Sequence, residues 1–326
     1  MAVESEVIST ELWIIFFTIL SVTIAIDLGL IHKIKRKLTK TPKTETEHVM
    51  SVKEALGWTI TWISLAGVFA GVIYFALGNE KMIEFVTGYT LEKSLSVDNM
   101  FVFLLVFTTL GIPHKYQHRV LSVGILSAIA MRIGIILVGA TLLDKFHWMI
   151  YIFGGMLLYT AIRMILQKEE KKIELEKNIA VRILKKFMPV NLSLVGSKFI
   201  VPINGVLHAT PLLVALAIVE LTDLVFAMDS IPAVLAITRD PFIVITSNVF
   251  AILGLRALYF LIGGMMERFH YLKPGLIVLL LFIGTKMMIS EIYPIPTATS
   301  LIIVFIILAV VIVASLLRKP KTVKHE

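Results

Sequence analysis

The sequence contains no cysteine. Disulfide bonds, thiolate metal sites and cysteine redox chemistry are therefore excluded. Charged residues are also scarce: they make up 17% of the 326 residues, while 57% are hydrophobic, a balance that would be unusual in a soluble domain. The sequence also lacks the GxxxxGK[ST] phosphate-binding pattern and any haem-attachment motif. We therefore expect neither a nucleotide-driven pump nor an enzyme.

The hydrophobic residues come in runs near twenty, which is the length that crosses the hydrocarbon core as a helix. The acidic N-terminus lacks the basic region of a cleaved signal peptide, so we expect residues 12–31 to be a retained span. The predicted fold class is an all-α polytopic membrane protein with about nine transmembrane helices. The nine predicted spans are about 12–32, 56–78, 82–110, 119–143, 147–166, 206–238, 242–264, 272–290 and 298–317.

The net charge of +8 is a topology signal, because Lys and Arg gather in alternate loops. Segments 33–55, 167–205 and 318–326 are rich in them, whereas the opposite loops hold only Lys81, Lys145 and Arg239. The positive-inside rule predicts a multi-pass plasma (inner) membrane protein with its N-terminus outside and its C-terminus in the cytoplasm. Basic residues confined to such loops do not favour nucleic-acid binding.

Two acidic segments are the chemical centre of the chain. EKSLSVDNMFVF (92–103) carries Glu92 and Asp98, and VELTDLVFAMDSIPA (219–233) carries Glu220, Asp223 and Asp229. The pairs Glu92/Asp98 and Asp223/Asp229 have the same spacing of six residues. A carboxylate at membrane depth costs at least about 2.5 kcal/mol and usually marks an ion or proton path.

The similarity between these segments continues downstream. Arg132 matches Arg256, DKFHW (144–148) matches ERFHY (267–271), and Arg163 matches Lys286. The repeated unit has three spans, so the second copy is predicted to lie inverted in the membrane, an arrangement typical of transporters. The predicted organisation is an N-terminal pair of spans (1–81), repeat A (82–166), a cytoplasmic connector (167–205), repeat B (206–290) and a C-terminal span with a basic tail (291–326).

The connector mixes charges at helical spacing, which favours a solvated amphipathic segment. A regulatory or lipid-surface role is the alternative for it.

The carboxylates face three candidate cations, Lys93, Arg132 and Arg256, so a fully ionised cluster would carry two excess negative charges. One divalent cation would neutralise them, and so would two protons, because burial favours the neutral carboxyl group. The donors are hard oxygens that suit Mg, Ca or Mn, and no His lies beside them. The predicted ligands are Glu92, Asp98, Asn99, Glu220, Asp223, Asp229 and Ser230, with Ser96, Arg132, Arg256, Pro232 and Asp27 in supporting roles.

Three further expectations concern geometry. Asp98 and Asp229, at matched repeat positions, should face one central space. Pro232 frees the carbonyl of Met228, so a helix break is expected at 228–232. Asp27 lies near the cytoplasmic end of the first span, where it can simply reach water, and a gate or entry role is the alternative. The alternative role for the acidic residues is ion pairing with Arg132 and Arg256 that only ties helices together.

The segments EKSLSVDNMFVF, VELTDLVFAMDSIPA and TSNVFAILGLRALYFL resemble the TerC family of integral membrane proteins, most closely its Alx branch. The resemblance implies manganese export, and by the family's older name tellurium resistance. It also implies that the family's acidic positions fall on Glu92, Asp98, Glu220, Asp223 and Asp229. The leading hypothesis is a secondary transporter that exports Mn²⁺ by proton antiport, with Mn²⁺ as the transported ion and no tightly bound cofactor.

Two other hypotheses belong to different classes. The first is a membrane-bound redox or stress-response modulator without direct transport, against which the lack of cysteine weighs. The second is a structural membrane partner for soluble stress proteins, for which the connector 167–205 is the only basis.

Overall fold

The computed structural model describes residues 2–27, 50–146, 148–166, 178–263, 272–290, 292–293 and 295–317. It divides into two units, Met1–Met50 and Ser51–Glu326. The first unit contains α1 (Ala2–Asp27), which covers most of the first predicted span. The rest of that span, most of the basic segment 33–55 and the side chain of Asp27 lie outside the described residues.

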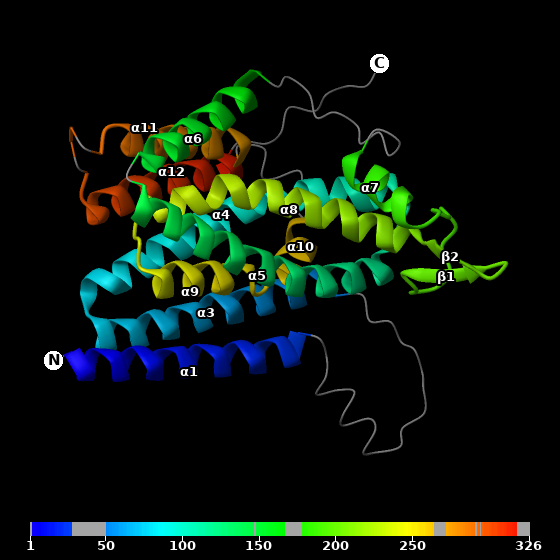
Figure 1. The fold of residues 1–326 in the computed structure, drawn as a ribbon, viewed down its shortest axis with the longest axis horizontal. Helices are drawn as coiled ribbons and strands as arrows, with labels where there is room; N and C mark the ends of the chain where they lie inside the picture. The colour runs from blue at the N-terminus through cyan, green and yellow to red at the C-terminus, as the bar shows by residue number, and fades with distance from the viewer. Residues whose placement is uncertain are drawn as a thin grey trace. The chain divides into compact units, whose positions relative to one another are not determined.

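The helices of the second unit follow the predicted spans closely (Figure 1). They are α3 (Val52–Leu77), α4 (Asn79–Thr109), α5 (His114–Lys145), α6 (Met149–Leu166), α8 (Pro211–Leu235), α9 (Pro241–Ile252), α10 (Leu255–Gly263), α11 (Leu272–Met288) and α12 (Thr297–Leu317). Between α6 and α8 lie α7 (Ile179–Phe187) and a hairpin of β1 (Ile200–Ile203) and β2 (Val206–Ala209). The described residues are therefore mostly helical, in keeping with the predicted all-α class.

Within the described residues, four helices are long and apolar enough to cross a membrane: α3, α5, α6 and α8. The pair α9 and α10, bent by 42°, would make a fifth span. Shorter apolar stretches lie at Thr10–Ile26, Pro274–Met288 and Ile302–Val311. The chain thus has several spanning helices, and the count of nine stays a prediction.

Local sequence explains where several helices start. Ser51 and Glu54 form a capping box at the start of α3. The carboxylate of Asp240 accepts hydrogen bonds from the backbone N–H groups of Phe242 and Ile243, and Pro241 occupies the first turn of α9. The span predicted from residue 206 begins instead at Pro211, because 206–209 pairs with β1 across the Asn204–Gly205 turn, where both residues have positive φ.

The predicted break at 228–232 is wrong. α8 is continuous from Pro211 to Leu235 and contains Pro232 in its last turns, where the missing N–H removes a single intrahelical hydrogen bond. The break lies instead between α9 and α10. There Gly254 has φ +81°, and a Cβ on it would lie 2.2 Å from the ring of Trp62 in α3. A glycine is required at this turn both by its backbone and by its close contact with α3.

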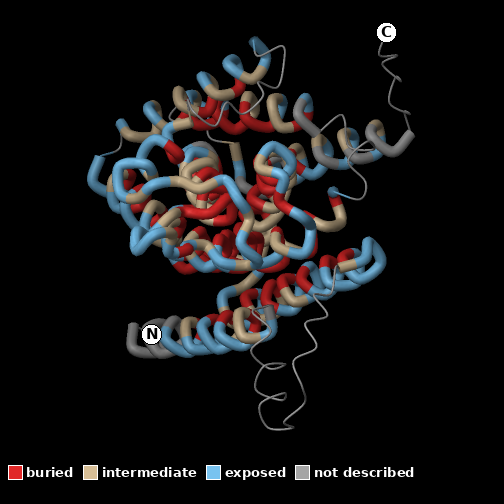
Figure 2. The backbone as a smooth tube through the Cα atoms, turned by 90° about the vertical axis from the view of Figure 1, so that its right-hand side faces the viewer, coloured by how far each residue is buried: buried red, intermediate tan, exposed pale blue. Residues whose placement is uncertain are grey.

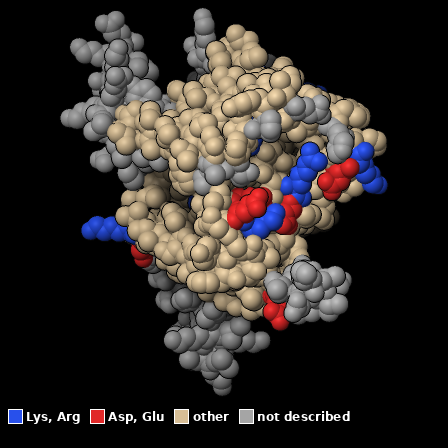
Figure 3. Space-filling view, turned by 90° about the vertical axis from the view of Figure 1, so that its left-hand side faces the viewer, with Lys and Arg blue, Asp and Glu red and all other residues tan. Residues whose placement is uncertain are grey.

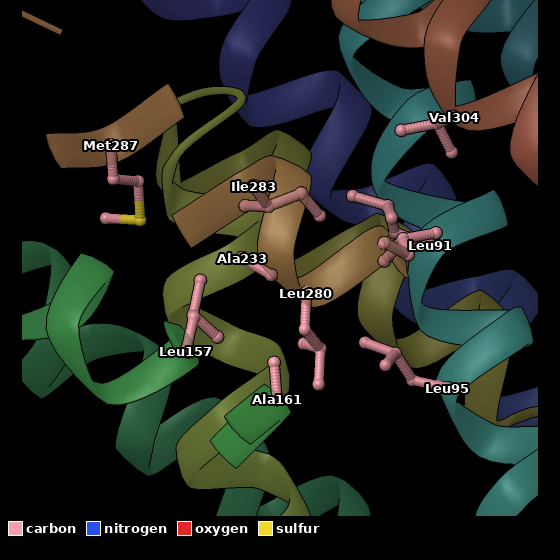
Figure 4. Close-up of a cluster of buried hydrophobic side chains, with 10 residues drawn as sticks. Leu91, Leu95, Leu157, Ala161, Ala233, Leu280, Ile283, Met287 and Val304 are labelled. Carbon is pink, nitrogen blue, oxygen red and sulfur yellow. The ribbon is translucent and has the colours of Figure 1, made fainter. Parts of the chain in front are cut away.

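The main helix contacts in the second unit join segments that are distant in sequence. α4 packs on α9, α5 on α8, and α6 on α11. Buried segments, red in Figure 2, gather where these helices meet. One apolar cluster joins Leu91 and Leu95 of α4, Leu157 of α6 and Leu280 of α11 (Figure 4). These contacts surround α4 and α8, the helices that carry the two acidic segments.

Candidate ion site

Arg132 of α5 joins the two acidic segments. Its Nε and Nη2 donate hydrogen bonds to Oδ2 and Oδ1 of Asp223 at 3.3 and 2.9 Å. Its Nη1 forms an ion pair with Glu92 and also donates to Oδ1 of Asn248 at 3.3 Å. A guanidinium is suited to this role because its donors form a rigid fork that matches a carboxylate.

The four side chains of this cluster come from α4, α5, α8 and α9, and all are buried; the side chain of Arg132 is 1% exposed. A single cation therefore serves two carboxylates away from water. When all three groups are ionised, the cluster keeps one excess negative charge. Removing Arg132 would leave two buried carboxylates without a cation, which is strongly destabilising.

Glu220 lies one turn before Asp223 on α8. Its Oε1 accepts a hydrogen bond of 2.7 Å from Ser127 of α5. Gly124 provides the room for this approach, since a Cβ there would lie 3.1 Å from the same oxygen. The second oxygen, Oε2, is buried without a hydrogen-bond partner among the described residues. Glu220 therefore keeps a carboxylate oxygen available inside the helix bundle.

Several other buried polar atoms of α4 and α8 have no hydrogen-bond partner within the described part of the chain. They are the hydroxyls of Tyr89, Ser96 and Ser230. Asn99 is buried on α4 as well. Unsatisfied buried polar groups are uncommon in folded proteins and each calls for an explanation, such as an ion or water that they serve. Here they lie along the same two helices as the carboxylates.

The register of α4 and α8 locates the positions of the remaining aspartates. Glu84, near the start of α4, accepts a hydrogen bond of 2.7 Å from Thr238, just after α8, whereas Glu92 and Asp223 meet at Arg132. The two helices are thus antiparallel. Asp98 lies six residues beyond Glu92 and Asp229 six residues beyond Asp223, so the two positions are displaced in opposite directions, by about 9 Å each along the helix axes.

This backbone arrangement does not favour the single central space predicted for Asp98 and Asp229. Asp98 lies on the same side of the Arg132 level as Glu220, and Asp229 on the same side as Tyr89. The side chains of Asp98 and Asp229 lie outside the described residues. Among the side chains that are described, no group of three His, Asp or Glu residues is arranged to hold a metal ion.

The other two candidate cations have different contacts. Lys93 donates from Nζ to the backbone carbonyls of Ala251 and Leu253, at 3.1 and 3.3 Å, beside the α9–α10 break. Nη1 of Arg256 lies 2.6 Å from Nε2 of His118 and 3.5 Å from Oγ of Ser122. The repeat therefore matches Arg132 and Arg256 in sequence, but their described contacts differ.

A second ionic cluster, which the sequence did not reveal, lies at the start of α4. Nζ of Lys81 lies 2.9 Å from Glu84 and 3.3 Å from Asp240, the residue that caps α9. Figure 3 shows acidic and basic side chains grouped at this end of the molecule. Burial lowers the pKa of Lys81, but its hydrogen bond to Glu84 and the charge of Asp240 raise the pKa overall. The cluster connects α4 to the α8–α9 turn.

Comparison with known proteins assigns the family. The description "Integral membrane protein TerC family" matches residues 77–323. The chain belongs to the TerC family. It is 45% identical, over 95% of its length and 93% of the relative's, to an uncharacterized membrane protein of Myxococcus xanthus.

Two enterobacterial relatives carry a name that proposes a membrane-bound redox modulator, Alx. The relative from Salmonella typhi is 47% identical over 82% of this chain and 85% of its own. The relative from Escherichia coli K12 is 42% identical over 91% of each chain. No solved structure matches this chain.

Proposed function

We propose that this TerC-family protein is a secondary transporter that exports Mn²⁺ from the cytoplasm in exchange for protons. The observation that carries the proposal is the buried cluster in which Arg132 joins Glu92 of α4 to Asp223 of α8. Charged groups inside a membrane protein are costly and commonly belong to an ion pathway. A purely structural tie would not need the additional carboxylates at Asp98, Glu220 and Asp229.

The proposed architecture is two inverted three-helix repeats, 82–166 and 206–290. The helix contacts support it. In the two repeats α4 corresponds to α8, α5 to α9 and α6 to α11. The contact of α4 with α9 therefore corresponds to the contact of α8 with α5, and the contact of α6 with α11 corresponds to itself. A pseudo-two-fold axis in the membrane plane requires this symmetry, and transporters with inverted repeats bind their substrates near such an axis.

The proposed path has two stations separated by Arg132. Asp98 and Glu220 would receive the ion on the cytoplasmic side, with the partnerless Oε2 of Glu220 as one ligand. Asp229 would hold it on the outer side, where the hydroxyls of Tyr89 and Ser230 are buried without partners among the described residues. The guanidinium between them would repel a cation and so prevent a continuous leak. Rocking of the two repeats would carry the ion past it.

The identity of the ion rests on two arguments. Carboxylate, hydroxyl and amide oxygens suit hard divalent ions such as Mg²⁺, Ca²⁺ and Mn²⁺. Among these, manganese is the ion that the family resemblance implies. Proton coupling follows from charge: an empty acidic station would take up protons, and an arriving metal ion would displace them because its ligands bind as carboxylates.

Reconstituted vesicles would test the exchange directly. With a pH-sensitive dye inside and Mn²⁺ on one side, manganese movement should drive protons in the opposite direction, and an imposed proton gradient should accelerate manganese movement against it. Export should slow when the outer pH rises, because fewer protons are available to reset the carrier. Saturable manganese movement that ignores a proton gradient of either sign would contradict antiport and leave a facilitated pathway.

The names of the Alx relatives favour a second candidate function, a membrane-bound redox modulator. The sequence contains no cysteine that could carry thiol chemistry, so such a role would act through another component. Manganese accumulation in cells that produce the unmodified chain, or a chain with all five carboxylates replaced by amides, separates the two functions. A redox effect that persists without the carboxylates would favour the second candidate.

A further inference from the structure

We propose that α7 is an interfacial helix that lies at the membrane surface and binds anionic lipid headgroups. The inference depends on the membrane location of the chain and not on the transported ion. It gives a specific role to part of the connector 167–205, and three observations carry it: the position of α7, its exposed apolar side chains and its basic side chains.

The position of α7 is fixed at the beginning of a spanning helix. Ala180 and Val181 are buried, and α7 packs on α8. The segment after α7 is held to the entrance of α8 by backbone hydrogen bonds: the N–H of Ala209 donates to the carbonyl of Pro189, and the N–H of Asn191 donates to the carbonyl of Ala209, both at 2.9 Å. Figure 1 shows α7 and the hairpin at the same end of the helix bundle.

The side chains of α7 fall into three sectors at about 100° per residue. Ala180, Val181 and Leu184 form the sector that faces the protein. Beside it, Ile179, Ile183 and Phe187 form an apolar sector, with 62%, 46% and 80% of each residue exposed. The remaining sector is basic.

The apolar sector has the spacing i, i+4 and i+8, so it is a continuous row along one side of the helix. A row of exposed Ile and Phe is unfavourable in water and normally marks a surface that something covers. For a helix anchored beside the start of a membrane span, lipid is the available cover. A strongly amphipathic helix with this pattern lies in the plane of the interface with its apolar side in the acyl region.

The basic sector consists of Arg182, Lys185 and Lys186, all exposed. In this orientation they lie at the level of the lipid headgroups and point away from the protein-facing sector. Clusters of Lys and Arg at the edge of a membrane are attracted to anionic lipids. The proposed topology places this end of α8 in the cytoplasm, where the positive-inside rule also places basic segments.

The absence of native cysteine makes the position of α7 directly measurable. Single substitutions Ile183→Cys, Phe187→Cys, Arg182→Cys and Lys185→Cys, each in the full chain, accept a nitroxide label at one place only. In vesicles, labels at 183 and 187 should be more accessible to dissolved oxygen than to a water-soluble nickel chelate, and labels at 182 and 185 should show the reverse. High chelate accessibility at all four positions would overturn membrane insertion. Low accessibility to both reagents at 183 and 187 would show that protein, such as a second copy, covers the row, and would also overturn it.

The preference for anionic lipid needs a second measurement. A fluorophore on Phe187→Cys is compared in vesicles that contain quencher-labelled phosphatidylglycerol or quencher-labelled phosphatidylcholine. Quenching by phosphatidylglycerol should be several-fold stronger, and Lys185→Gln/Lys186→Gln should remove the difference. Lys115→Gln/Lys198→Gln, which also removes two exposed lysines, should keep it. Equal quenching by both lipids in the labelled Phe187→Cys protein that keeps all its lysines would overturn headgroup recognition.

Discussion

Two ionic clusters join α4 to the α8–α9 region, and each contains one cation between two carboxylates. In the inner cluster Arg132 pairs with Glu92 and Asp223. In the outer cluster Lys81 pairs with Glu84 and Asp240. The Arg132 side chain is 1% exposed and the Lys81 side chain 32% exposed. The two clusters therefore have the same charges, but the cation is buried in one and partly exposed to solvent in the other.

This difference in burial assigns different roles to the two clusters. An exposed ion pair exchanges its partners for water at little cost and contributes about 0–1 kcal/mol. A buried pair cannot do so, and losing one partner costs about 3–5 kcal/mol. The outer cluster is therefore expected to be the weaker link between α4 and the α8–α9 turn. The inner cluster is suited to holding both acidic helices in register and to separating the two proposed ion stations.

The largest expected effect is that of Arg132→Met. The substitution leaves Glu92 and Asp223 buried without their cation, so the free energy of unfolding should fall by about 3–5 kcal/mol, and manganese export should be lost. Denaturation of the purified protein in detergent measures the first effect and vesicle transport the second. Arg163→Met, at an exposed position near the end of α6, is the matched control.

A rescue variant sharpens this prediction. Adding Glu92→Gln and Asp223→Asn to Arg132→Met removes the unpaired charges and should restore much of the lost stability without restoring export. If Arg132→Met alone were as stable as the parent chain, the inner cluster would not be a buried charge network of the kind that we infer.

The second largest effect is expected for Asp98→Asn and Asp229→Asn, and it concerns transport alone. Each should reduce manganese export by at least about tenfold. Losing about 1.4 kcal/mol of binding free energy for the ion already weakens its binding by that factor. Membrane insertion should be unchanged, because the substitutions remove a charge from the hydrocarbon. Asp144→Asn, at an exposed position in the last turn of α5, is the control. Normal export by either variant would exclude that residue as a ligand.

An intermediate effect is expected for Lys93→Met. Nζ of this lysine donates hydrogen bonds to the backbone carbonyls of Ala251 and Leu253 at the α9–α10 break, and not to a carboxylate. Its loss leaves two acceptors without their donor, which costs about 1–3 kcal/mol for a buried group. Thermal unfolding in detergent should show this loss relative to Arg163→Met. No change in unfolding would mean that the break does not depend on Lys93.

The sequence predicted the helices of the second unit well, because long apolar runs and turn residues are local signals. It placed the break incorrectly because Pro232 is a visible helix breaker, whereas the real break depends on Gly254 fitting against Trp62, a residue distant in sequence. A proline so close to the end of α8 has little left to interrupt.

The acidic segments were also readable from sequence, because charges inside apolar runs are conspicuous. Their partners were not. Ser127 and Asn248 are ordinary polar residues of α5 and α9, and only the packing of α5 against α8 and α9 brings them to Glu220 and Arg132. The opposite displacement of Asp98 and Asp229 likewise depends on the register of two antiparallel helices, which matched repeat positions do not reveal.

The smallest effect is expected for Lys81→Met. It tests whether burial alone explains why the two clusters contribute differently to stability. Lys81 and Asp240 are partly exposed, at 32% and 28%, whereas Glu84 is only 10% exposed. Screening therefore weakens this cluster, and the free energy of unfolding should fall by about 1 kcal/mol, less than for Arg132→Met. Added salt at about 1 M should reduce this difference further while leaving the cost of Arg132→Met unchanged.

The pH dependence of Lys81→Met has a defined sign. The pKa of Lys81 is raised above its ordinary value of 10.5, so the folded chain holds this proton more tightly than the unfolded chain. The stabilisation is then fully present below pH 10.5 and lost as the pH rises through the folded-state pKa. Unfolding of the parent chain and the variant should therefore differ by a constant amount around neutral pH and converge only in strong alkali. If Lys81→Met instead cost as much as Arg132→Met at neutral pH, solvent exposure would not be what distinguishes the two clusters.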